Sequence, residues 1–224
     1  SMFMVGDALL HADIPWDADT GGHNYDFSRI LGHVGAIAKP YDLAYYNQET
    51  ILGGDDLGIH GYPTFNGPQA WGDAMESYGF NLVSLANNHS LDMGQTGLNN
   101  SLNFWKKKSD VVTSGVYASQ ADREAIPVHE VNGIKYAFFS WTYGMNGLQC
   151  PDGQEYEVAC YDGHEKEMLD QITAAKKQAD VVIVAMHWGT EYVSEATSEQ
   201  QRIGQELADA GADIIVGNHP HVIG

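Results

Sequence analysis

Basic residues are scarce in this chain. Its 224 residues include 11 Lys and Arg against 30 Asp and Glu, which gives a formal net charge of -19 at pH 7. A surface so acidic repels phosphate backbones and argues against nucleic acid as a partner. The only basic cluster, residues 106–108, follows a predicted helix, where positive charge suits the helix dipole. We therefore give these lysines a structural role.

Long apolar runs and cysteines are scarce too. No stretch reaches about 18 apolar residues, the length that predicts a membrane span, so we predict no transmembrane segment within this chain. No secretory leader is recognised in it either. We expect the sequence to be trimmed at both ends, so a leader or membrane anchor would lie outside it. Its two cysteines, Cys150 and Cys160, flank a short polar stretch and either close a small disulfide loop, which we favour, or stay unpaired.

Apolar periodicity predicts an α/β protein. The 43% hydrophobic content suits one globular domain over residues 1–224. Apolar residues recur with helical spacing in five stretches, and short apolar runs between them predict strands. The dipeptide Asn132-Gly133 predicts a hairpin turn, so we expect mixed sheets. The expected strands cover residues 43–47, 81–85, 111–113, 127–131, 135–140, 181–186 and 213–216, and the helical stretches cover 27–37, 70–75, 98–105, 168–175 and 203–210.

Polar residues that bind metals follow several of the predicted strands. In open α/β sheets, the carboxyl ends of the strands are where ligands and reactive groups gather. Divalent metals need carboxylates, neutral imidazoles and amide oxygens, and a pair of them lowers the pKa of coordinated water and stabilises an in-line displacement. Taken singly, these residues have ordinary alternatives, such as capping a helix or supporting a turn; taken together they predict a metal centre. The residues concerned are Asp7, Glu49, Asn88, His89, His187, His219 and His221.

Five motifs, in this order, resemble the poly-γ-glutamate capsule synthesis family known as CapA or PgsA, which itself is similar to the calcineurin-like metallophosphoesterases. The resemblance covers essentially the whole chain and implies a four-layer sandwich of two mixed β-sheets flanked by helices. The motifs are Gly6-Asp7-Ala8-Leu9-Leu10-His11, Asn47-Gln48-Glu49-Thr50, residues 85–94 around Asn88-His89, His187-Trp188-Gly189-Thr190-Glu191-Tyr192 and Gly217-Asn218-His219-Pro220-His221.

The resemblance also implies a role for each motif residue. Asp7 and His221 would bind a first divalent metal, Glu49 would be shared between two, and Asn88, His187 and His219 would bind the second. The metal could be Mn, Zn, Fe or Mg. Glu49 replaces the shorter Asp of metallophosphoesterases, which alters metal spacing or choice.

Two histidines are the expected catalytic residues. His89 would be the general acid for the leaving group. His11 lies four residues after Asp7, where the related enzymes have a closer histidine, and it is left as a ligand, a residue behind the ligands or a substrate contact. Glu191 and Tyr192 would orient His187 or meet substrate. Asp92 would fix its loop and start the next helix, or meet substrate.

Two functions follow from the resemblance. The first is a metal-dependent hydrolase that acts on a phosphoester or on a bond of a cell-envelope polymer, outside the cytoplasm at the bacterial cell surface. The second is a non-catalytic component of poly-γ-glutamate synthesis or export, in which the same residues hold metal or polymer without turnover. Either way, the expected partners are poly-γ-glutamate or another envelope polymer, and membrane-bound capsule synthesis proteins. Membrane attachment would require a segment outside this sequence.

Overall fold

The computed structural model describes residues 1–223, which form two compact units. Unit 1 comprises Ser1–Leu85 and His89–Thr113, and unit 2 comprises Ala86–Asn88 and the chain from Ser114 onward. Each unit contains one four-stranded sheet. The α/β class is therefore confirmed, whereas the single domain and the four-layer sandwich stay predictions.

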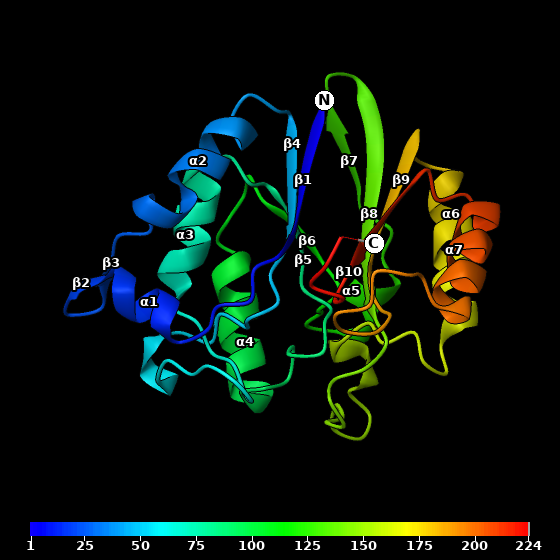
Figure 1. The fold of residues 1–224 in the computed structure, drawn as a ribbon. Helices are drawn as coiled ribbons and strands as arrows, with labels where there is room; N and C mark the ends of the chain where they lie inside the picture. Colours follow the sequence, from blue (N-terminus) through cyan, green and yellow to red (C-terminus); the bar gives the residue numbers. More distant parts are fainter. Residues whose placement is uncertain (224) are drawn as a thin grey trace. The chain divides into compact units, whose positions relative to one another are not determined.

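The sheet of unit 1 has the strand order β1-β4-β5-β6, and β1–β4 and β4–β5 pair in parallel. Strand β4 is buried at all five positions, as expected of a strand covered on both faces. Helices α2, α3 and α4 lie on the same side of this sheet (Figure 1). The elements of unit 1 are β1 (Met2–Asp7), α1 (Asp13–Ala18), β2 (Asp19–Gly21), β3 (Asn24–Tyr25), α2 (Ser28–Ala38), β4 (Leu43–Asn47), the 3-10 helix η1 (Asp55–Leu57), α3 (Gln69–Ser77), β5 (Leu82–Ser84), α4 (Gly94–Trp105) and β6 (Val112–Ser114), whose last residue belongs to unit 2.

The sheet of unit 2 has the order β10-β9-β8-β7, with β7 antiparallel and the other pairs parallel. The expected mixed sheet is thus found here. Asn132 and Gly133 both have positive φ, 52° and 79°, and join β7 to β8 in the predicted hairpin. The elements of unit 2 are α5 (Gln120–Glu124), β7 (Val128–Val131), β8 (Ile134–Thr142), the 3-10 helix η2 (Glu155–Glu157), α6 (Glu165–Lys176), β9 (Val181–His187), α7 (Ser198–Ala210) and β10 (Ile214–Asn218).

Helices α6 and α7 lie side by side on one side of this sheet (Figure 1). Helix α7 has signals at both ends. Thr197 and Gln200 form a reciprocal capping box at its start, and Gly211 adopts the left-handed conformation at its end. Ile203 and Leu207, one turn apart, are fully buried and hold the helix to the unit. The capping residues and the apolar spacing therefore specify the same helix.

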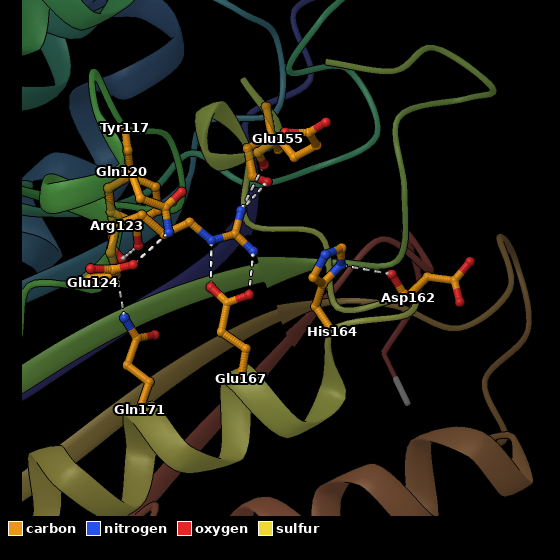
Figure 2. A network of polar contacts seen from close by, with 11 residues as sticks. Tyr117, Gln120, Arg123, Glu124, Glu155, Asp162, His164, Glu167 and Gln171 are labelled. Carbon is orange, nitrogen blue, oxygen red and sulfur yellow. Dashed lines mark hydrogen bonds and ion pairs between the residues drawn. The ribbon is translucent and has the colours of Figure 1, made fainter. Parts of the chain in front are cut away.

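A buried arginine ties together the irregular part of unit 2 (Figure 2). Arg123 is only 4% exposed and donates from Nε and Nη2 to both carboxylate oxygens of Glu167, at 2.6 and 3.2 Å. Its Nη1 donates to the carbonyls of Glu155 and Val158, each at 2.9 Å. The guanidinium also lies 5.1 Å from the ring centre of Trp141. One side chain thus fixes the segment around η2 against a strand and a helix.

Two further expectations can be compared with the described residues. Cys150 and Cys160 are unpaired thiols, so the favoured disulfide was wrong. Burial raises the pKa of both thiols above its usual value. Among the helices of residues 1–223, none has the length and apolar character needed to cross a bilayer.

Candidate functional site

In unit 1, the parallel strands bring three polar residues to one edge of the sheet. Asp7 lies opposite Asn47, and Asn47 lies opposite Ser84. Asn47 donates from Nδ2 to Asp7 Oδ1 at 2.7 Å, and its own Oδ1 accepts from Ser84 Oγ at 2.7 Å. The Tyr45 hydroxyl lies 2.9 Å from Ser84 Oγ. This buried chain of hydrogen bonds fixes the direction of the Asp7 carboxylate.

Glu49 lies in the loop that leaves β4, and backbone hydrogen bonds hold that loop against the one leaving β1. The Ala8 amide donates to the Asn47 carbonyl at 2.8 Å, and the Thr50 amide donates back to the Ala8 carbonyl at 3.1 Å. Glu49 is fully buried, and its carboxylate lies within 4.8 Å of that of Asp7. Two carboxylates so close repel each other unless a proton or a cation lies with them.

His89 and Asp92 form an oriented pair in unit 1. The Nδ1 atom of His89 lies 2.6 Å from Oδ2 of Asp92, which also accepts from the Phe65 amide at 2.6 Å. Because a carboxylate only accepts, Nδ1 carries the proton in this pair. The ring of Phe65 packs edge-on against both His89 and His11, at 4.6 and 5.2 Å between centres.

This geometry settles the position of Asp92. Helix α4 begins at Gly94, its N-cap residue is Met93, and no side chain caps it. The expected helix-start role of Asp92 was therefore wrong: its carboxylate is committed to His89 and to the Phe65 amide. The structure also places the two expected catalytic histidines on the same aromatic ring.

In unit 2, the carboxyl ends of three parallel strands align Thr142, His187 and Asn218. His187 is buried, and its Nε2 lies 2.8 Å from Oδ1 of Asn88. Asn88 in turn donates from Nδ2 to Asn146 Oδ1 at 3.3 Å. The backbone of Tyr143 follows β8 and donates to the His187 carbonyl at 3.1 Å.

His219 and His221 follow the end of β10 in a strained loop. Both have positive φ, 96° and 55°, as does Tyr192 at 62°. Such conformations are costly for residues other than glycine and concentrate at functional sites. The Tyr192 amide donates to the Pro220 carbonyl at 2.8 Å, which fixes this loop against the one leaving β9. The Glu191 carboxylate and the two imidazoles therefore offer ligand atoms within 4.8 Å of one another.

The donor set of unit 2 fits a divalent metal. Imidazole nitrogens with carboxylate or amide oxygens suit Zn, Mn or Fe. His187 Nε2 and Asn88 Oδ1 lie 2.8 Å apart, and ligand atoms of His187 and His219 lie within 4.8 Å of each other, so all three residues could hold one ion. With the metal bound, Nε2 would be deprotonated and both atoms would face the ion.

Three residues that were not predicted as site residues support these groups. Asn47 orients Asp7, Phe65 contacts both His11 and His89, and Tyr143 packs 5.0 Å from the His219 ring. Asn47 carried a signal, since it ends a strand two residues before Glu49. The other two lie in irregular loops, where no spacing indicates which aromatic side chain turns inward.

Comparisons with known proteins point to one family. The model of the family described as "Bacterial capsule synthesis protein PGA_cap" matches residues 1–224. The "PGA biosynthesis protein CapA" of Bacillus subtilis (strain 168) is 33% identical over 66% of this chain and 39% of its own length. The "Capsule biosynthesis protein CapA" of Bacillus anthracis is 30% identical over 100% of this chain and 54% of its own length. The chain thus spans about half the length of the curated relatives, or less.

A solved structure shares the fold. The crystal structure of a hypothetical protein from Thermus thermophilus aligns with 99% of this chain and 68% of its own, with a TM-score of 0.57 and 20% sequence identity. At that identity the likeness concerns the fold alone.

Proposed function

Because the chain belongs to the family of bacterial capsule synthesis protein PGA_cap, we propose that it is a metal-dependent hydrolase of capsule or poly-γ-glutamate biosynthesis. Its substrate would be a phosphoester or a bond of a cell-envelope polymer. The observation that carries this proposal is the cluster at the carboxyl end of the unit 2 sheet, where Glu191, His219 and His221 offer ligand atoms within 4.8 Å. A loop serving only to connect strands would not need a buried histidine in a left-handed conformation.

Asn88 and His187 would complete the metal ligands of unit 2. A divalent cation supplies Lewis-acid stabilisation of a developing negative charge and lowers the pKa of water. That two metals are present rests on the resemblance, which adds Asp7 and Glu49 as ligands. The proximity of these two carboxylates within unit 1 supports a cation beside them.

Proton transfer would fall to His89. Asp92 accepts from Nδ1 and orients the ring, so Nε2 is the atom that would give a proton to the leaving group. Asp92 acts through His89 and is a positioning residue. His11, which contacts the same Phe65 ring as His89, would contact substrate.

Metal content and turnover test the proposal together. Protein incubated with Mn, Zn, Fe or Mg is passed through gel filtration, and retained metal is measured by elemental mass spectrometry in wild type, His187→Ala and Glu49→Gln. The matched control is His33→Ala, an exposed histidine of α2. We expect close to two metals per chain, fewer in both site variants, and turnover of a generic phosphoester that falls with them. No retained metal in wild type would refute the mechanism.

A second function calls for a direct comparison, because the names of the curated relatives refer to biosynthesis and not to hydrolysis. In that alternative the protein binds polymer or assists its export without turnover. Metal-loaded protein that binds poly-γ-glutamate and cleaves neither phosphoesters nor amides would favour it. Under either function we place the protein outside the cytoplasm, at the cell surface, with membrane-bound capsule synthesis proteins as partners. The four-layer sandwich belongs to the same proposal.

A further inference from the structure

A polar cavity lies within unit 1, between the loop that follows Leu52 and helix α4. Its volume is about 380 Å³, at the lower end of the range of small-molecule sites, and it shares no residue with the proposed metal centre. Its wall includes Gly53, Gly54 and the ring of Phe104. The polar side chains that line it are Asp55, Asp56, Gln69, Asn100, Asn103 and Lys107.

The loop that forms one wall is held in place by Asn66. This fully buried side chain accepts from the Gly53 amide at 2.9 Å and donates to the carbonyls of Gly54 and Gly58, at 3.0 and 2.5 Å. Asn100 donates from Nδ2 to the Gly53 carbonyl at 2.9 Å and so joins the loop to α4. Gly54 has a φ of 91°, which a side chain would strain. The cavity is therefore preorganised.

Several polar groups of the lining have hydrogen-bonding capacity that the protein does not use. Gln69 donates from Nε2 to two backbone carbonyls, at 3.4 and 3.2 Å, and Asn100 donates to the Gly53 carbonyl. The amide oxygens of both side chains accept no hydrogen bond from residues 1–223. Over the same residues, the side chains of Asn103 and Asp56 make no hydrogen bond or ion pair. A ligand here therefore meets both unused acceptors and unused donors.

The charges of the lining disfavour ionic ligands of either sign. Two carboxylates against one ammonium repel phosphates and other polyanions. Asp55 is already engaged, because it accepts from the Tyr25 hydroxyl and lies 3.1 Å from His23 Nδ1. Asp56 is thus the one carboxylate left for a cation, and Lys107 opposes a cation in the same cavity. A neutral polar ligand fits this balance best.

We infer that this cavity binds a neutral sugar of one or two rings with free hydroxyl groups. Each hydroxyl both donates and accepts, so one ligand donates to Asp56 and to the amide oxygens of Gln69 and Asn100 while it accepts from Asn103. Phe104 is only 6% exposed, so stacking adds little and hydrogen bonds carry the affinity. We expect a dissociation constant of about 1 mM.

Titration of isotope-labelled protein with sugars tests this inference. Protein kept free of metal with a chelator is titrated with the methyl glycosides of glucose, galactose, mannose and N-acetylglucosamine, and NMR follows the side-chain amide signals of Gln69, Asn100 and Asn103. We expect at least one sugar to shift these signals saturably. A methyl glucuronide should bind about 3- to 10-fold more weakly than the glucoside, because its carboxylate meets the aspartates.

Variants locate the sugar within the cavity. Asp56→Ala and Asn103→Ala should each weaken binding about 3- to 10-fold, since each loses hydrogen bonds to the ligand. The matched control is Asn99→Ala, an exposed asparagine of the same helix that does not line the cavity. The backbone amide spectrum of each variant shows whether it is folded.

Three results would overturn the inference. They are no saturable shift with any of the sugars, equal effects of Asn103→Ala and Asn99→Ala, and tighter binding of the neutral amide N-acetylglycine methylamide than of every sugar. Metal content and phosphoester turnover are measured separately on His187→Ala. If that variant loses metal and turnover but keeps its sugar affinity, the cavity acts independently of the metal centre. Loss of sugar binding in folded His187→Ala would instead move the sugar to the metal centre and refute the inference.

Discussion

Replacement of Arg123 by methionine should destabilise the protein by about 2.5–4.5 kcal/mol. Three losses make up this figure. The buried Val158 carbonyl loses its donor, at about 1–3 kcal/mol. The ion pair with Glu167, whose carboxylate is 40% exposed and therefore screened, contributes about 0.5 kcal/mol. The contact with the Trp141 ring adds about 1 kcal/mol. Methionine fills most of the space, so no large cavity forms.

Urea unfolding followed by tryptophan fluorescence measures this loss. We expect the midpoint to fall while the slope stays unchanged. Arg202→Met is the matched control, since Arg202 pairs with two glutamates on the surface and its removal should change stability little. Glu167→Gln should cost less than Arg123→Met, because the amide oxygen still accepts one hydrogen bond. A decrease of less than about 1 kcal/mol in the free energy of unfolding of Arg123→Met would refute the reasoning. It would show that water takes over the hydrogen bonds of the guanidinium at little cost.

Three further predictions concern single positions. Asp92→Asn should lower kcat on a phosphoester by about 10- to 100-fold with metal content and KM nearly unchanged, as steady-state kinetics would show; equal kcat would contradict its positioning role. Cys150 and Cys160 should react slowly with iodoacetamide near pH 8 and faster as pH rises, because burial raises their pKa and keeps them as thiols; alkylation at the rate of the urea-unfolded protein would contradict this. Gly189→Ala should lower the thermal midpoint, since its φ is 91° and an added Cβ would lie 2.7 Å from a side chain of α7, whereas Gly204→Ala, inside α7 with its nearest contact at 3.7 Å, should not; equal midpoints for the two variants would refute the steric argument.

The elements of the fold that were predicted best from the sequence are the buried ones. Strand β9 begins with four β-branched residues and was predicted almost to the residue, because a strand buried on both faces is apolar nearly throughout. Helix α1 and the hairpin β2–β3 were missed: six residues beginning Asp-Ile-Pro and a polar Asp-Thr-Gly carry no periodic signal. These elements depend on contacts with distant residues, such as the hydrogen bond from Tyr25 to Asp55. Sequence patterns do not report contacts of that kind.

The site residues whose proximity was predicted from the sequence are those at the ends of strands. His187 and His219 were predicted to lie together because adjacent parallel strands end at one edge, and their rings are 4.7 Å apart. The partner of His89 was not predicted, since an aspartate two residues before a helix has the ordinary meaning of a cap. Only the fold shows that Asp92 turns back to the imidazole. Which side chain a polar residue turns toward is a three-dimensional property.

Unit 2 includes a tripeptide, Ala86–Asn88, that the gene encodes between two segments of unit 1. It lies within the sequence of unit 1 but packs with unit 2, where the Ala86 amide donates to Ser140 Oγ at 3.3 Å and Asn88 contacts His187. A fragment expressed from Ser114 onward would therefore lack the side chain that contacts His187 and part of its own interior. The two units cannot be cloned, swapped or inherited as separate modules by a single cut. Recombination within this chain must preserve all three passages of the backbone between the units, after Leu85, after Asn88 and after Thr113.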